Sequence, residues 1–220
     1  GVSINYKDDA YAKGTAIFDV ERGQLADINP RFWQTDTAVA KNSRGYTENN
    51  DFKKPESIVC DLLDIVSKNG AMLLNIGPKA DGTITAEDEA VLRGIGGWLK
   101  ANGEAVYGTT YWAVYGEGPT EIVEGTFQDV ARKDYTTEDV RFTYKAPYIY
   151  ANILKWPKDG KVTIRTMAEG KKYFKGLIED ISLLSYDYPV EYTRDEEGLK
   201  LTVNEKIDTE YPVTFKITID

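Results

Sequence analysis

"PESIVCDLLDIVSKNGAMLLNIGPKADGTI" spans residues 55–84 and joins a helix pattern directly to a strand pattern. The first part has apolar residues at 58, 59, 62, 63, 65 and 66, which form one wide helical face. Pro55 opens this helix, and Asn69-Gly70 gives it a stop. The run "AMLLNI" (71–76) is apolar on both faces, as in a buried strand of a parallel sheet covered by helices. The stretch therefore predicts an α/β fold.

The flanking sequence continues the same alternation of strands and helices. Residues 2–4 alternate apolar and polar side chains, as in a short strand, and "TAIFDV" (15–20) is a compact β-rich run. After the turn at Asp81-Gly82, Thr85 is placed to cap a second helix, with Asp88 as a shorter partner in the capping box. We expect an α/β domain over residues 1–112.

The pattern changes from about residue 113. Several short runs alternate apolar and polar residues at period two, and turn signals such as Lys158-Asp159-Gly160 separate them. This spacing is typical of an antiparallel β-sandwich, which we expect over residues 113–220. The predicted fold class is thus α/β followed by all-β. The runs are "DVRFTY", "YIYANIL", "KVTIRT", "GLKLTV" and "VTFKITI", with a less regular candidate in "LIEDISLL".

Composition excludes several kinds of chemistry. The 220 residues carry a formal charge of −9, which disfavours nucleic acid and anionic membranes as partners, and no apolar run is long enough to span a bilayer. No histidine is present, so Ser-His-Asp and Cys-His nucleophile systems and His-ligated zinc are excluded within the chain. The single cysteine, Cys60, lies in the helical pattern and is interpreted as a buried thiol.

Ligands of parallel α/β sheets bind beyond the carboxyl ends of the strands, which selects three places here. At the first, "DVERGQ" (19–24), Asp19, Glu21 and Arg22 crowd together. A carboxylate beside a guanidinium can act as a general acid/base or hold sugar hydroxyls, and a surface ion pair is the alternative.

The second and third places are the predicted loops 32–46 and 75–84. Trp33 beside Gln34 and Asp36 is typical of a sugar site, although an ordinary loop with one packed tryptophan fits equally well. In the third loop the Gly-Lys-Ser/Thr ending of a phosphate-binding loop is absent, so Gly77-Pro78 is interpreted as the rim of a pocket. Asn75 is expected to brace neighbouring loops.

Five motifs, in this order, resemble the α-L-fucosidase family of glycoside hydrolases. The resemblance is close over about residues 1–120, whereas residues 121–220 share only a C-terminal β-sandwich with the family. It implies the C-terminal part of a (β/α)8-like barrel followed by that sandwich. The motifs are "DVERGQ", "WQTDT", "DIVSKNGAMLLNIGPKADGTI", "IGGWLKANGEAVYGT" and "YGEGPT".

The family implies retaining hydrolysis of terminal α-L-fucose without a cofactor or metal. One carboxylate attacks the anomeric carbon, and a second protonates the leaving oxygen and later activates water. The nucleophile of the family is an Asp on an earlier barrel strand, upstream of anything matched here. Among the remaining carboxylates, Glu21 is favoured as acid/base and Asp36 is the runner-up. Arg22 resembles the arginine that holds fucose hydroxyls, and Trp33 and Gln34 are further candidate substrate contacts.

This chain departs from the family pattern at two positions. Family members commonly read Ser-Trp-Gly-Tyr where this chain has Ser43-Arg44-Gly45-Tyr46, so Arg44 is a candidate substrate contact that would change specificity or abolish activity. Many members have Trp-Glu where this chain has Trp33-Gln34, and an amide cannot donate and recover a proton.

The expected substrate is a fucosylated oligosaccharide or glycoconjugate, and a second chain or copy is a candidate for completing the barrel. The alternative function is a non-catalytic carbohydrate-binding or structural remnant of a fucosidase. The compartment stays open, with a bacterial periplasm or secretion favoured over the cytoplasm.

Overall fold

The computed structural model describes residues 4–8, 11–12, 14–129 and 133–220. The chain divides into two compact units, of which the first contains residues 1–97 and 121–133 and the second contains residues 98–120 and 134–220. Helix α2 (Ala86–Asn102) crosses the division. The division after residue 97 therefore precedes the expected boundary between residues 112 and 113, because the end of this helix packs within the second unit. No helix among the described residues is long and apolar enough to cross a bilayer.

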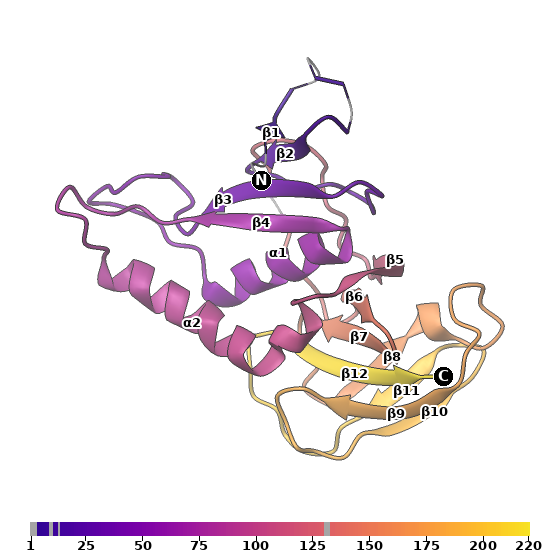
Figure 1. Cartoon of the computed structure of the whole chain (residues 1–220). Coiled ribbons are helices and arrows are strands. Elements are labelled where there is room, and N and C mark those ends of the chain that lie inside the picture. Colours follow the sequence, from indigo (N-terminus) through magenta and orange to yellow (C-terminus); the bar gives the residue numbers. More distant parts are fainter. Residues whose placement is uncertain (1–3, 9–10, 13, 130–132) are drawn as a thin grey trace. The chain divides into compact units, whose positions relative to one another are not determined.

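A parallel sheet of four strands forms the first unit, in the order β1-β2-β3-β4 (Figure 1). The α/β fold expected from the sequence is confirmed. The predicted loop at 32–37 is largely a strand, because Thr35 and Thr37 fit the buried pleat while Gln34 and Asp36 take the other face. Part of the expected strand at 2–4 lies outside the described residues. The strands are β1 (Asn5–Tyr6), β2 (Ile17–Glu21), β3 (Trp33–Ala38) and β4 (Gly70–Asn75).

Helix α1 (Pro55–Ser67) covers one face of this sheet. Its Ile65 joins the buried side chains of Val20, Leu25 and Trp33 in a small core. The helix stops where predicted, because Asn69 adopts a left-handed conformation with φ 71° that turns the chain directly into β4.

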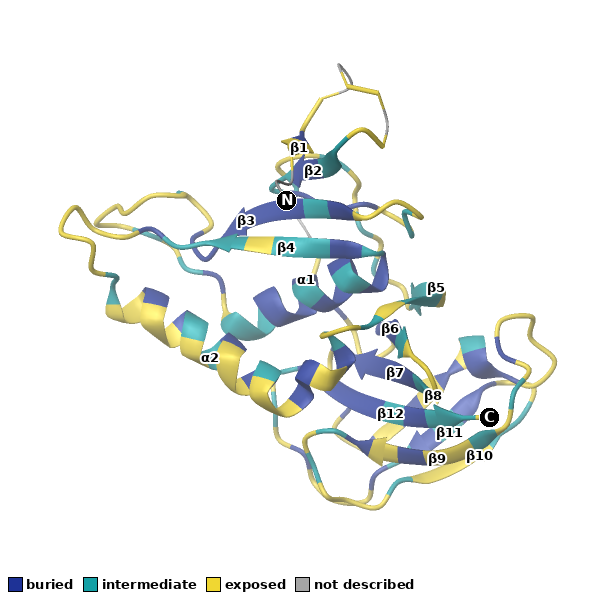
Figure 2. Ribbon diagram, in the orientation of Figure 1, coloured by how far each residue is buried: buried dark blue, intermediate teal, exposed yellow. Residues whose placement is uncertain are grey.

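Strand β4 is the last strand in the sheet order. The sequence predicts that both of its faces are buried, but only the face under α1 packs against a core. Leu73 is 55% exposed, and most of its neighbours in the strand are half-buried (Figure 2). Met72 packs against the core under α1, whereas Leu73 points to the opposite face. No helix of the described residues covers that opposite face, so Leu73 leaves part of it apolar and exposed.

Helix α2 begins with the predicted capping box. The backbone N–H of Asp88 donates to Thr85 Oγ1 at 3.0 Å, and the Asp88 carboxylate accepts from the backbone N–H and the hydroxyl of Thr85. The spacing predicts a buried stripe of Val91, Ile95, Trp98 and Leu99, of which the first three are buried and Leu99 is half-buried.

The second unit is the expected antiparallel sandwich, with a five-stranded sheet (β5-β6-β7-β12-β9) and a three-stranded sheet (β10-β11-β8). Phe142 and Phe215 of the first sheet and Ile164 and Leu199 of the second share one core. The elements are β5 (Thr110–Glu117), β6 (Val140–Lys145), β7 (Tyr148–Ile153), β8 (Lys161–Ile164), β9 (Ile178–Leu183), β10 (Glu191–Arg194), β11 (Leu199–Thr202) and β12 (Val213–Ile219), with short 3-10 helices η1 (Gly103–Ala105) and η2 (Arg165–Met167).

Strands β5 and β10 were not among the predicted runs. The pairing of β5 with β6 shifts register between Tyr111 and Gly116, so β5 has no unbroken period-two pattern. Strand β10 leaves most of its side chains exposed, so it lacks the apolar face that identifies a strand in sequence.

The end of α2 is expected to be needed for a stable sandwich. Trp98 Nε1 donates to the carbonyl of Pro212 at 2.9 Å, and Thr143 Oγ1 donates to the carbonyl of Ala105 at 2.6 Å. A segment of residues 113–220 loses both hydrogen bonds and should unfold with a free energy about 2 kcal/mol below that of residues 98–220, at about 1 kcal/mol per bond. Urea denaturation of the two segments measures the difference, and equal midpoints would place the boundary at 112/113.

Candidate functional site

The pairing of β2 with β3 gathers four polar side chains on one face of the parallel sheet. Asp19 is in register with Gln34, and Glu21 is in register with Asp36. Side chains alternate between the faces of a strand, so these four share one face while Val20 and its neighbours face the core under α1. Glu21 is the last residue of β2, so the pair lies toward the carboxyl ends of the strands, where ligands of parallel sheets bind.

Two cations from the loops close this cluster. Lys7 Nζ lies 2.7 Å from Asp36 Oδ1 and 3.3 Å from Glu21 Oε2. Arg44 Nη2 lies 2.6 Å from Glu21 Oε1 and 2.7 Å from Asp36 Oδ2. Both carboxylates are therefore bridged twice, once by each cation, which fixes Glu21 and Asp36 relative to each other. We call Lys7, Glu21, Asp36 and Arg44 the ion cluster.

Asp19 is buried beside the ion cluster, with its Oδ2 3.9 Å from Lys7 Nζ. Burial raises the pKa of Asp19 above its ordinary value, while the positive charge of Lys7 opposes this shift. Gln34 Nε2 donates weakly to its Oδ2 at 3.5 Å. Burial acts to lower the pKa of Lys7, but the hydrogen bonds to Asp36 and Glu21 and the charge of Asp19 outweigh this effect. The pKa of Lys7 is therefore raised above its ordinary value, and Lys7 stays cationic.

The loop that carries Arg44 is held by the end of β4. Asn75 Nδ2 donates to the backbone carbonyl of Arg44, which is the bracing role expected for this asparagine. Gly77 packs so closely that a Cβ there would lie 2.6 Å from the carbonyl carbon of Gly45. Lys79 Nζ lies 5.7 Å from the centroid of the Tyr46 ring. The stretch after β4 thus positions Arg44 over the carboxylates.

Replacing Gly77 by alanine is expected to displace this loop. The added methyl group meets backbone atoms of Gly45 and Tyr46 at 2.6–2.9 Å, and backbone cannot rotate away as a flexible side chain can. Overpacking of this kind costs about 1–3 kcal/mol of unfolding free energy. Chemical denaturation of the chain measures it, with Gly45→Ala as the matched control, since a Cβ at Gly45 meets nothing within 4 Å. Equal losses in both variants would refute close packing at Gly77.

Arg22 does not join Glu21, although the two are adjacent in sequence. Its φ of 47° turns the side chain to Asp129, whose Oδ2 lies 3.1 Å from Arg22 Nε. Lys53 Nζ and Thr37 Oγ1 also lie 2.7 Å from this carboxylate oxygen. Burial would raise the pKa of Asp129, but these hydrogen bonds and the charges of Lys53 and Arg22 hold it below its ordinary value. Arg22 therefore has a structural ion pair in this structure, and contact with fucose stays a prediction.

Trp33 corrects a prediction. Its side chain is fully buried, and Nε1 donates to the carbonyl of Lys68 at 2.9 Å. It lies on the face of β3 opposite Gln34 and Asp36, because successive side chains alternate. The ring therefore packs the core under α1 and offers no free face for stacking on a sugar, so the interpretation as a packed tryptophan holds.

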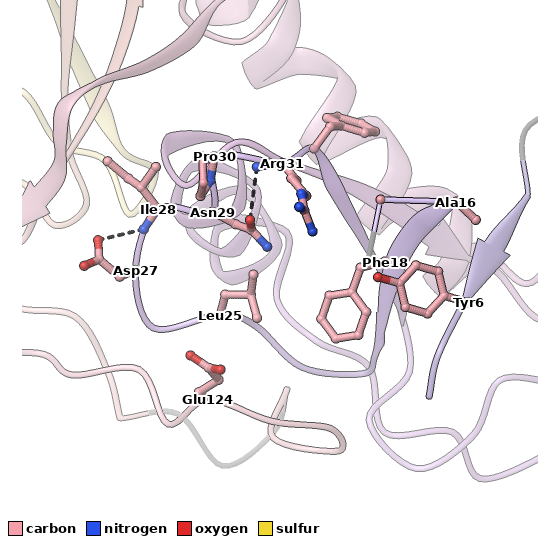
Figure 3. Close-up of a pocket in the computed structure, with 12 residues that line it drawn as sticks. Tyr6, Ala16, Phe18, Leu25, Asp27, Ile28, Asn29, Pro30, Arg31 and Glu124 are labelled. Carbon is pink, nitrogen blue, oxygen red and sulfur yellow. Dashed lines mark hydrogen bonds between the residues drawn. The ribbon is translucent and has the colours of Figure 1, made fainter. Parts of the chain in front are cut away.

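A pocket of about 760 Å³ opens on the other face of β1 and β2. Figure 3 shows Tyr6 and Phe18 beside a turn in which Asp27 and Asn29 accept hydrogen bonds from the backbone N–H groups of Ile28 and Arg31. These carboxylate and amide groups serve the turn. The ion cluster, at the carboxyl ends of the strands, is the stronger candidate for chemistry.

Sequence reasoning identified Glu21, Asp36 and Arg44 but missed Lys7. Lys7 is the first residue after β1 and occupies the same strand-end position as Arg22 after β2, and this position is the signal that identifies it. Asp129 was also missed, because it lies 107 residues from Arg22 and no local pattern connects them.

A carboxylate at the end of a parallel strand, in an α/β unit whose chain continues into a β-sandwich, fits the acid/base of the glycoside hydrolase class. Two family models match this chain: "Alpha-L-fucosidase" over residues 2–104 and "Alpha-L-fucosidase C-terminal domain" over residues 132–218. The chain belongs to the alpha-L-fucosidase family.

Relatives and solved structures agree with this assignment. Plasma alpha-L-fucosidase of Homo sapiens is 36% identical over 147 residues, which cover 64% of this chain and 28% of the relative. Tissue alpha-L-fucosidase of Rattus norvegicus is 30% identical over 196 residues, which cover 84% of this chain and 37% of the relative. The structure of the Thermotoga maritima alpha-fucosidase in complex with fucose matches with a TM-score of 0.72 and 25% identity, over 98% of this chain and 44% of that one. The chain thus spans less than half the length of these relatives.

Proposed function

We propose that this chain is the C-terminal part of a retaining α-L-fucosidase that hydrolyses terminal α-L-fucose from glycans or glycoconjugates. Residues 1–112 form the end of the catalytic barrel and residues 113–220 the sandwich. The nucleophile is an Asp of an earlier barrel strand, supplied by an upstream segment, a second chain or a copy. The observation that carries the proposal is Glu21, the last residue of β2, in register with Asp36 in the second half of β3.

Glu21 acts as the acid/base in this proposal. Glu21 is the last residue of β2 and its side chain is 29% exposed. Asp36 lies within β3 and its side chain is 11% exposed. A general acid must reach the leaving oxygen, which favours the longer and more accessible Glu21. Asp36 is the runner-up, and Gln34 beside Asp19 is a candidate hydrogen-bond partner for the sugar.

The reaction proceeds in two steps. The nucleophilic Asp attacks the anomeric carbon while Glu21 transfers its proton to the glycosidic oxygen, so the C–O bond breaks and a fucosyl-enzyme ester forms. Glu21 then removes a proton from water, which attacks the same carbon and releases fucose and the free Asp. The two carboxyl groups stand about 5–5.5 Å apart in retaining enzymes. For Glu21 to move, its contacts with Lys7 and Arg44 must loosen.

Hydrolysis of an aryl α-L-fucoside by the chain, alone and assembled with the upstream half of the barrel, tests the proposal. Turnover is expected only in the assembled protein, with α-L-fucose as the first product seen by NMR. Turnover by the chain alone would refute the need for an upstream nucleophile. A β-anomer as first product would refute retention.

One observation favours the alternative, a carbohydrate-binding or structural remnant. Lys7 and Arg44 hold both Glu21 and Asp36 in ion pairs, and such bridges also serve purely to connect strand ends. Fucose binding to the assembled protein without any hydrolysis would support this alternative, and turnover would exclude it.

A further inference from the structure

We propose that Arg44 selects fucosides that carry an anionic group, a sulfate ester or a carboxylate, next to the glycosidic bond. The inference rests on the proposed function and adds a class of substrate to it.

The cations of the ion cluster are more exposed than its carboxylates. The side chains of Arg44 and Lys7 are 40% and 41% exposed, whereas those of Glu21 and Asp36 are 29% and 11% exposed. In the chain by itself, a ligand that approaches from solvent therefore meets positive charge before the carboxylates. Because the whole chain carries −9, this cationic rim is a local feature and not a property of the general surface.

Arg44 keeps donors for a ligand while it bridges the carboxylates. Among the described residues its contacts with Glu21 and Asp36 both use Nη2, so Nε and Nη1 remain. A guanidinium presents its N–H groups as a planar fork that matches the oxygens of a sulfate or carboxylate. The loop is braced by Asn75 and by the close packing of Gly77 on Gly45, so this fork is held in place before a ligand arrives.

The charge balance changes in the state that reacts. A general acid is neutral before it gives up its proton, so protonated Glu21 no longer offers Arg44 a negative partner. Both cations then pair with Asp36, and only Lys7 also lies near the buried Asp19, at 3.9 Å. An anionic group on the substrate restores the missing negative charge at Arg44. A neutral substrate leaves the guanidinium with Asp36 alone.

The test compares fucosyl disaccharides whose second sugar carries a sulfate, a carboxylate, the corresponding carboxamide or a free hydroxyl. For the assembled enzyme, kcat/KM is expected to be about two- to fivefold higher for each anionic member, the size of a partly exposed ion pair. Arg44→Gln should abolish the preference, and Arg44→Lys should retain part of it without the fork. Lys54→Gln is the control, since the Lys54 side chain is 80% exposed and outside the cluster.

Sulfur-linked analogues of the same disaccharides, which resist hydrolysis, give dissociation constants independently of turnover. Equal rates and affinities for anionic and neutral members would overturn the inference while hydrolysis of the neutral ones upholds the proposed function. Absence of all hydrolysis would overturn the proposed function, and an Arg44-dependent affinity for the anionic analogues would still uphold anion recognition. A preference for only the sulfate or only the carboxylate identifies which anion is recognised.

Discussion

Glu21→Gln in the assembled enzyme is expected to lower kcat by about 10²–10⁴-fold for fucosides with poor leaving groups, the usual contribution of a general acid/base. The amide cannot protonate the glycosidic oxygen, so the first bond cleavage stalls. Fucosides with good leaving groups need no such proton, and the fucosyl-enzyme should still form from them. Rates for a disaccharide and for a dinitrophenyl fucoside separate the two cases.

Azide should rescue the Glu21→Gln variant, since it attacks the fucosyl-enzyme without help from a base, and fucosyl azide should accumulate. Glu48→Gln is the matched control, because Glu48 is an exposed carboxylate of the loop that carries Arg44. If Asp36→Asn gives this pattern while Glu21→Gln behaves like the wild type, the role of acid/base moves to Asp36.

Lys68→Met is expected to lower the unfolding free energy of the chain by about 3–5 kcal/mol, because it removes the cation that lies 2.6 Å from a buried carboxylate. Lys68 Nζ lies 2.6 Å from Asp64 Oδ2 and also donates to the carbonyl of Leu25 at 2.9 Å. Both charged side chains have no exposed area. The hydrogen bond from Trp33 goes to the backbone carbonyl of Lys68 and should survive.

A double-mutant cycle separates the lost charge pair from lost packing. Replacing both partners, Asp64→Leu with Lys68→Met, removes the buried charges together and should recover much of the loss, since apolar replacements of buried ion pairs are often neutral or stabilising. Lys54→Met, at an exposed lysine, should change the unfolding free energy by less than about 0.5 kcal/mol. Additive effects of the two substitutions of the buried pair in urea denaturation would contradict the coupling.

Local sequence determined the elements whose pattern is complete within one segment. The helix over Pro55–Ser67 and its stop at Asn69 follow from apolar spacing and from turn chemistry, as does the capping box of Thr85 and Asp88. The motifs that resemble the fucosidase family are also local, and they are sufficient to identify Glu21, Asp36 and Arg44 as candidate site residues. The antiparallel sandwich followed from period-two runs with turns between them.

The tertiary structure decided which side chains meet. Glu21 and Arg22 are adjacent in sequence, but their side chains have different partners. The left-handed conformation of Arg22 places its guanidinium against Asp129, which is distant in sequence. Trp33 turns from a predicted sugar contact into core, because strand pairing sets which face of β3 meets α1.

Lys7 and Arg44 reach the same two carboxylates from different loops. The physical reason is range: helix and turn preferences act within a few residues, whereas ion pairs and sheet register join groups that only the folded chain brings together.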